Sequence, residues 1–286
     1  HKLNKAKENY YLKITSQKRW FDLNIKEILN YKDLLILFVK RDITTFYKQT
    51  ILGPLWFFIQ PLITTIVFSF IFNKVAKIST GQIPPFLFYM SGVIAWNYFS
   101  ECLLSTTTTF TSNSYIFGKV YFPRLIIPFS KIVSNLVKLL VQLSLFFCFF
   151  IYLYFENNSI ISISKSIIFI PFIIFHMGLL GLSIGMIISS LTTKYRDLRY
   201  LVSFSIQLLM YATPIAYPLS AIPEKYNYII LYNPMTPIIM GFRNSLLGTG
   251  YFDPNLYFYS VLSLVALLLI GIVLFNRVEK TFIDTV

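Results

Sequence analysis

Six long apolar segments are the feature that most constrains this sequence. Each has about 20 mostly hydrophobic residues, the length that a helix rising 1.5 Å per residue needs to cross a hydrocarbon layer about 30 Å thick. They are too long and too evenly apolar for strands of a barrel. The sequence therefore predicts an all-α integral membrane protein with six transmembrane helices, over residues 53–73, 87–111, 132–155, 167–191, 200–218 and 256–275.

The composition excludes an ordinary soluble domain. Hydrophobic residues make up 56% of the chain and charged residues only 13%, whereas soluble domains have about 25% charged residues. The formal net charge of +13 fits either nucleic acid or an anionic membrane surface. The apolar content favours the membrane, so lipids and not nucleic acid are the expected partners.

The lysines and arginines are distributed unevenly between the two sides of the predicted spans. With a cytoplasmic N-terminus, 19 of the 25 lie on the inner side and 5 on the outer side, while Lys138 lies within a span. Cytoplasmic loops of membrane proteins are enriched in these residues. We therefore expect a multi-pass membrane protein with both termini in the cytoplasm. Its parts are a cytoplasmic segment 1–52, a membrane domain 53–275 and a cytoplasmic tail 276–286.

Two regions outside the spans have patterns of their own. From Tyr31 to Leu52, apolar residues at helical spacing alternate with charged ones, which predicts an amphipathic helix in the inner interface. The loop 219–255 is too apolar for disorder, and short re-entrant helices broken at Asn233-Pro234 fit it best. The fifth span is expected to end in a bend, because it contains Pro214 and Pro218.

No pattern typical of catalysis occurs in the sequence. The tripeptide Gly118-Lys119-Val120 lacks the upstream Gly and the Ser/Thr of a Walker A loop, and there is no GxSxG, HExxH or clustered His, Cys and carboxylate set. His176 stands alone in the fourth span, where a hydrogen bond to a neighbouring helix is the expected role. We therefore expect no ATPase site, no metal and no cofactor on this chain.

Two charged residues lie within the predicted spans. Glu101 is about 15 Å and Lys138 about 9 Å from the cytoplasmic ends of their helices, at 1.5 Å per residue. A lysine side chain is long enough to bridge that difference, so an ion pair is geometrically possible; alternatively Lys138 reaches the inner interface. Either structural role is favoured over a proton relay, which would need a longer series of such groups.

Aromatic and small polar residues are mixed in the first, second and fifth spans. Sugars stack their C–H faces on aromatic rings and bond their hydroxyls to small polar groups, although such residues also form interfacial belts and join helices. The channel-lining candidates are Trp56, Phe57, Gln60, Thr64, Tyr89, Trp96, Phe99, Ser100 and Tyr211.

Several short motifs, in this order along the chain, resemble the membrane subunit of type 2 ABC exporters, specifically O-antigen polysaccharide permeases. Each is weak alone, and their order and position relative to the six spans make the resemblance specific. They are Arg41-Asp42, Tyr47-Lys48-Gln49-Thr50, Leu52-Gly53-Pro54-Leu55-Trp56, Gln60-Pro61, Gly92-Val93-Ile94-Ala95-Trp96, Lys119-Val120-Tyr121-Phe122-Pro123-Arg124, Tyr195-Arg196-Asp197, Thr213-Pro214-Ile215-Ala216-Tyr217-Pro218 and Asn233-Pro234-Met235.

The resemblance implies a homodimer of six-span subunits around a channel, paired with two copies of an ATP-binding subunit that holds ATP and Mg. The substrate it implies is a polysaccharide on an undecaprenyl diphosphate carrier, for which Arg41 and Lys48 are candidate diphosphate contacts. It assigns the amphipathic helix to the interface and the loop 219–255 to periplasmic gate helices. It also assigns the segment 112–124 to coupling with the ATPase, with Ser114, Tyr115, Phe117, Lys119 and Arg124 as candidates.

Two other functions are compatible with these features. The same family contains exporters of teichoic acid, capsule and drugs, and these motifs do not specify the substrate. An ATP-independent secondary carrier is disfavoured, because the spans contain few charges and no paired interrupted segments in corresponding halves.

Overall fold

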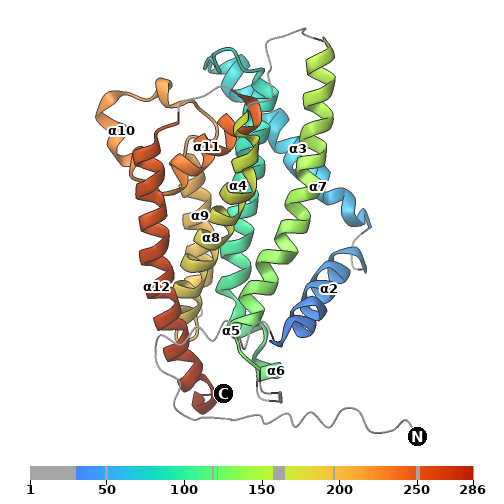
Figure 1. Cartoon of the computed structure of the whole chain (residues 1–286), viewed down its shortest axis with the longest axis vertical. Helices are drawn as coiled ribbons and strands as arrows, with labels where there is room; N and C mark the ends of the chain where they lie inside the picture. Colours follow the sequence, from blue (N-terminus) through green and yellow to red (C-terminus); the bar gives the residue numbers. More distant parts are fainter. Residues whose placement is uncertain are drawn as a thin grey trace, which may run out of the picture.

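The computed structural model describes residues 30–48, 51–117, 119–120, 122–156, 165–195, 197–248 and 252–285. Most of the N-terminal segment, together with the motif residues Gly118, Tyr121 and Arg196, lies outside these ranges. Within them every regular element is helical and there is no strand. The helices stand side by side in one bundle, with α10 and α11 at one end and α5 and α6 at the other (Figure 1). The prediction of an all-α protein is therefore confirmed.

Four helical segments of the described chain are long and apolar enough to cross a membrane. They correspond to the first, third, fourth and sixth predicted spans. The first combines η1 (Gly53–Leu55), α3 (Trp56–Phe68) and the π-helical η2 (Ser69–Val75), and the fourth combines η3 (Lys165–Phe169) with α8 (Ile170–Thr192). The third is α7 (Ile126–Glu156), and the sixth is α12 (Pro254–Thr285), which continues into the expected tail.

The second and fifth predicted spans form shorter helices than expected. α4 (Pro85–Thr107) is interrupted at Thr108 and followed by α5 (Thr109–Ser112) and α6 (Ser114–Phe117). Its last turn is rich in threonines whose hydroxyls bond to local carbonyls, as Thr107 does to Leu104, and this competes with the helix. α9 (Leu198–Tyr211) ends before Pro214, because proline disfavours helical geometry in the residue before it.

The region between α9 and α12 contains two short helices separated at Asn233-Pro234, where the sequence predicts a break. They are α10 (Glu224–Leu231) and α11 (Met235–Leu247), preceded by the single turn η4 (Leu219–Ala221). α10 is largely exposed, whereas α11 is buried along most of its length. Gly248, with φ of 68°, ends α11 in the left-handed conformation that glycine adopts without strain.

The amphipathic helix of the N-terminal region is α2 (Lys32–Lys48). Phe38 is buried in a cluster with Phe122 and Ile126, and Leu34 and Leu35 pack against the same cluster. The apolar face expected to lie in the membrane interface is therefore docked on the start of α7, beside which α2 lies in Figure 1.

α4 lies at the centre of the bundle and packs against α3, α7, α8 and α11. Its approach to α8 depends on three glycines of α8 at helical spacing: Gly178, Gly181 and Gly185. A Cβ on Gly181 would lie 2.8 Å from the carbonyl oxygen of Phe99, and one on Gly185 would lie 2.6 Å from Cβ of Thr106. Small residues let membrane helices pack backbone to backbone in this way.

Replacing Gly185 by Ala should therefore destabilise the bundle. The new methyl group would also lie 2.9 Å from the carbonyl oxygen of Leu103, so the two helices must separate, at a cost of about 1–3 kcal/mol for an overpacked core. Gly241→Ala on α11 is the matched control, because its nearest neighbour is 3.4 Å away, at an edge atom of Phe252. Unfolding in detergent measures both variants, and equal stability would contradict the close α4–α8 contact.

Candidate functional site

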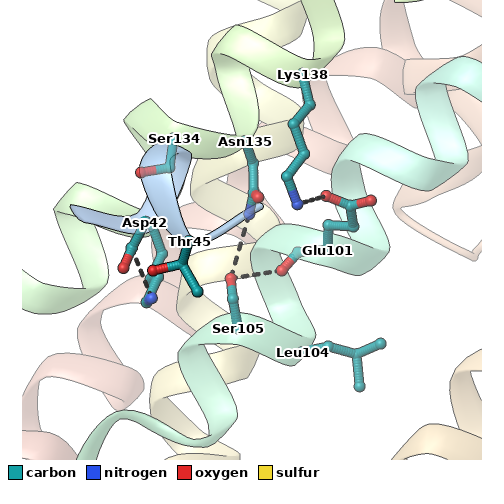
Figure 2. A pocket seen from close by; sticks show the side chains of 9 residues that line it. Asp42, Thr45, Glu101, Leu104, Ser105, Ser134, Asn135 and Lys138 are labelled. Atoms are coloured by element: carbon teal, nitrogen blue, oxygen red, sulfur yellow. Dashed lines mark hydrogen bonds and ion pairs between the residues drawn. The ribbon is translucent and has the colours of Figure 1, made fainter. Parts of the chain in front are cut away.

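A polar pocket of about 330 Å³ opens between α2, α4 and α7. Figure 2 shows Asp42 and Thr45 entering it from α2, Glu101 and Ser105 from α4, and Asn135 and Lys138 from α7. Three helices from distant parts of the sequence thus bring charged and hydrogen-bonding groups to one place. Its lining residues are Asp42, Thr45, Glu101, Leu104, Ser105, Lys131, Ser134, Asn135 and Lys138.

Two ion pairs bridge the helices around this pocket. Lys138 Nζ lies 2.7 Å from Glu101 Oε2, joining α7 to α4, and Lys131 Nζ lies 2.6 Å from Asp42 Oδ2, joining α7 to α2. The structure thus brings together the two charges that the sequence places inside the spans. Sequence reasoning missed the pair between Asp42 and Lys131. The available signal was that Asp42 lies one turn after Phe38 on the same face of α2, the face that docks on α7.

Neutral polar groups complete the pocket. The amide of Asn135 donates a hydrogen bond to Ser105 Oγ at 3.2 Å, and Ser105 in turn donates to the carbonyl oxygen of Glu101. Because each lysine already faces a carboxylate, the pocket presents donors and acceptors together and has little excess positive charge. Such a lining suits a ligand that both donates and accepts hydrogen bonds better than it suits a bare anion.

The two residues proposed to contact a diphosphate have different surroundings. The Arg41 guanidinium bonds to Asp42 Oδ1 at 3.0 Å and lies 4.8 Å from the ring centre of Phe38, so it is partly engaged within α2. Lys48 is exposed in the last turn of the same helix. The structure therefore leaves Lys48 more accessible than Arg41 to a ligand from outside.

The candidates for a channel lining fall into three groups by their exposure. Trp56 and Tyr211 are 47% and 53% exposed, and Gln60 is exposed on the same helix as Trp56, while Phe57, Thr64 and Ser100 are half-buried. Tyr89, Trp96 and Phe99 are buried in the main core, because α4 lies at the centre of the bundle. Within this chain these three rings are therefore part of the core, and the channel-lining candidates on its surface are Trp56, Gln60 and Tyr211.

The segment between α4 and α7 presents only part of its predicted coupling residues to the surface. Tyr115 and Lys119 are exposed, whereas Phe117 and Arg124 are buried; the side chain of Ser114 is outside the described part of the chain. Arg124 is 5% exposed, lies 4.9 Å from the ring centre of Phe117 and donates to the carbonyl oxygen of Glu279 at 2.9 Å.

Arg124 therefore joins the segment 112–124 to the last turns of α12. Burial lowers the pKa of its guanidinium, and the nearby Glu279 carboxylate opposes that shift. Arg124, which the resemblance assigns to coupling with an ATPase, is thus buried within this chain. In this structure Arg124 positions the segment, and the exposed Tyr115 and Lys119 remain the accessible candidates.

His176 bridges α8 and α12 near the opposite end of the bundle. Its Nδ1 lies 3.2 Å from Tyr257 Oη and its Nε2 lies 3.4 Å from Ser260 Oγ. Ser260 Oγ also donates to the carbonyl oxygen of Pro234 at 2.6 Å, which ties the α10–α11 break to α12. In the described part of the chain, no three His, Cys, Asp or Glu side chains are grouped as a metal site requires.

Breaking the ion pair between Glu101 and Lys138 should show strong energetic coupling. Glu101→Gln leaves the ammonium of Lys138 partly buried without its carboxylate, and we expect a loss of about 1–3 kcal/mol, between the values typical of exposed and buried pairs. The double variant with Lys138→Met should be more stable than the sum of the single losses, as measured by unfolding in detergent. Additive losses would contradict the pair, and Asp33→Asn on the exposed face of α2 is the control.

Comparisons with known proteins agree with this architecture. The family model of the ABC-2 type transporter matches residues 33–247. An O-antigen export system permease protein RfbA of Klebsiella pneumoniae is 32% identical over 267 residues, covering 92% of this chain and 98% of the relative. A second protein of that name from K. pneumoniae is 30% identical, covering 88% and 94%. One from Myxococcus xanthus is 25% identical, covering 77% and 82%. Because the family model spans well over half of a chain that packs several long apolar helices into one bundle, this multi-pass membrane protein belongs to the ABC-2 type transporter family.

Proposed function

We propose that this chain is the permease subunit of an ABC exporter that moves an undecaprenyl-diphosphate-linked polysaccharide of O-antigen type across the bacterial inner membrane. The observation that carries the proposal is the similarity to an O-antigen export permease along nearly the whole of that relative. Energy for transport comes from a separate ATPase subunit, because the sequence has no P-loop of its own. ATP and Mg are bound by that partner, in two copies per pair of permeases.

The arrangement of the helices supports six membrane crossings. α4 and α9 are the two further crossings beside the four longer spans. The chain passes through α5 and α6 at one end of the bundle and through α10 and α11 at the other (Figure 1). The C-terminus lies at the α5–α6 end. This end is also richer in lysine and arginine, with Lys119, Arg124, Lys194, Arg199 and Arg277, so we assign it to the cytoplasmic side by the positive-inside rule. α10 and α11 are then the periplasmic gate helices.

The exposed face of α9 supports a polar path between two copies of the chain. Tyr200, Ser203, Gln207 and Tyr211 recur at intervals of three or four residues and are all exposed, so they form one stripe along the helix. Polar groups facing lipid are costly, and a stripe of this kind is better placed against protein or a water-filled path. A second stripe on α3 contains Trp56, Gln60 and Thr64, with Thr64 half-buried.

The end of the bundle with α5 and α6 supports a docking surface for the ATPase. Tyr115 and Lys119 are exposed there, and the segment that carries them leads directly into α7. The closure of two ATPase subunits on ATP would displace this segment, and the difference in ATP affinity between the two states supplies the driving force. Lys48, exposed at the end of α2, is the proposed contact for the lipid diphosphate, whose headgroup carries the opposite charge.

Co-expression with a candidate ATP-binding subunit encoded beside this chain tests the function. We expect a stable complex that hydrolyses ATP only when both subunits are present. We also expect cells without the permease to lose surface polysaccharide and to regain it with the wild-type gene. A chain that binds no such subunit and moves solute down an ion gradient alone would overturn the proposal.

Removing an aromatic ring from the α9 stripe should lower export without affecting assembly. Tyr211→Ala deletes one stacking surface, worth about 1 kcal/mol or about a fivefold change in rate, while the dimer and its complex with the ATPase persist. Phe175→Ala on α8 is the control, because Phe175 is an exposed ring outside the two stripes. The measurement is polysaccharide reaching the cell surface per amount of complex, and equal losses in both variants would count against the α9 path.

A further inference from the structure

Arg243 on α11 is a buried cation that neither the resemblance nor the proposed function explains. Its side chain is 6% exposed, and its guanidinium carbon lies 3.6 Å from the ring centre of Phe88 on α4. The hydrogen bonds that it donates go to backbone carbonyls and a hydroxyl rather than to a carboxylate. Nη1 bonds the carbonyl oxygen of Pro214 and Nη2 that of Ile215, both at 3.2 Å, and Nε lies 3.4 Å from Ser91 Oγ.

The two carbonyl acceptors of Arg243 lie in the turn Thr213–Tyr217, which we call the α9 corner because it follows the end of α9. Pro214 and Ile215 are buried there and are not part of a helix, so their carbonyl oxygens have no helical donor. A buried carbonyl without a donor is costly, particularly at membrane depth. The two Nη groups of one planar guanidinium satisfy two successive carbonyls at once, which the single ammonium of a lysine does not do equally well.

The residues at the start of α11 provide a second attachment for the α9 corner. Asn233 Nδ2 donates to Thr213 Oγ1 at 2.9 Å, while Asn233 Oδ1 accepts a hydrogen bond from the backbone N–H of Met235 at the beginning of α11. Arg243 lies about 12 Å along α11 from Met235, at 1.5 Å per residue, and Asn233 lies two residues before Met235. The α9 corner is therefore attached to α11 by Arg243 and to the residue before its N-terminal cap by Asn233. A shift of α11 would move the corner with it.

Two features of the surrounding packing matter for the corner: Gly92 leaves room for the guanidinium, and a cavity lies beside the corner. A Cβ on Gly92 would lie 2.8 Å from Nη2 of Arg243 and 3.1 Å from Cγ2 of Ile215, so α4 accommodates both groups only because residue 92 is glycine. Beside them is a cavity of about 210 Å³, whose lining includes Thr80, Pro218 and Ser220. The corner is thus held by hydrogen bonds at a place where it is not closely packed on every side.

We propose that Arg243 is a positioning residue that holds the α9 corner against α4 and so keeps the outer end of the export path closed between transport cycles. The role in gating rests on the proposed function, in which α9 lines the path. The attachment of the corner does not rest on it, because it follows from the contacts of Arg243 alone. Opening then requires the two carbonyls to leave the guanidinium, which remains stabilised by the ring of Phe88.

Thiol accessibility at the corner tests the attachment directly. Ala216 is buried in the corner, so Ala216→Cys, in a background with the exposed Cys148 replaced by Ser, should react slowly with a membrane-impermeant maleimide. Arg243→Lys keeps the charge and loses the planar fork. We expect it to raise the reaction rate about tenfold, which corresponds to about 1.4 kcal/mol, the scale of one charge-assisted hydrogen bond. The other cysteine, Cys102, is buried and remains unlabelled.

Two controls separate opening of the corner from general loosening of the fold. Ser220 is exposed beside the cavity. The maleimide should therefore label Ser220→Cys at the same rate in the parent protein and in the Arg243→Lys protein. Ser91→Ala removes the longest of the three hydrogen bonds of Arg243, together with a local bond from Ser91 to the carbonyl oxygen of Phe88 within α4. Because both carbonyls of the corner keep their donors, the reactivity of Ala216→Cys should stay near that of the parent. If both controls behave as expected, the faster reaction of the Arg243→Lys protein reports the corner itself.

Ion leak through the resting complex, reconstituted in vesicles without ATP, tests the gating role. Arg243→Lys should raise the leak while the complex with the ATPase still assembles. An unchanged rate at Ala216→Cys in a folded Arg243→Lys protein would overturn the attachment, and a faster rate without a raised leak would overturn the gating role. Should Arg243→Lys not fold, Gly92→Ala displaces the guanidinium instead, and unchanged reactivity there would equally overturn the proposal.

Discussion

The close approach of α8 to α4 is the contact on which the rest of the structure depends. Gly181 and Gly185 of α8 let the two backbones meet, and Gly178 leaves room for the side chain of Tyr98. This packing places α4 at the centre of the bundle, where it is surrounded by protein. A helix in that position can hold Glu101 beside Lys138 and Ser91 beside Arg243, because neighbouring helices supply their partners. The same groups on a lipid-facing helix would be costly. The polar pocket and the α9 corner are thus both built on α4.

Sequence reasoning was reliable where length and local chemistry decide the structure. Four predicted spans correspond to long apolar helices, and the break between α10 and α11 falls at Asn233-Pro234 as proline predicts. It was less reliable for orientation within the bundle. Inner and outer faces of a membrane protein are similarly apolar, so nothing in the sequence around Trp96 distinguishes a core ring from a ring beside a path.

Arg243, the most unusual buried charge, was not identified from the sequence because its partners are main-chain atoms. Arg243 bonds to carbonyl oxygens of Pro214 and Ile215, and every residue has such an oxygen, so no side-chain pattern marks the pairing. The glycine contact was detectable in principle, since Gly178, Gly181 and Gly185 recur within one apolar segment. The ion pair between Asp42 and Lys131 needed the docked position of α2, which only the folded chain provides.

The hydrogen bond from Arg124 to the carbonyl oxygen of Glu279 has a mechanical consequence. The segment 112–124 continues into α7 through its backbone and is attached to the end of α12 through this side chain. α7 and α12 stand on opposite sides of α4 (Figure 1). A displacement of the segment would therefore act on both flanks of the bundle at once, through the backbone on the α7 side and through the Arg124 side chain on the α12 side.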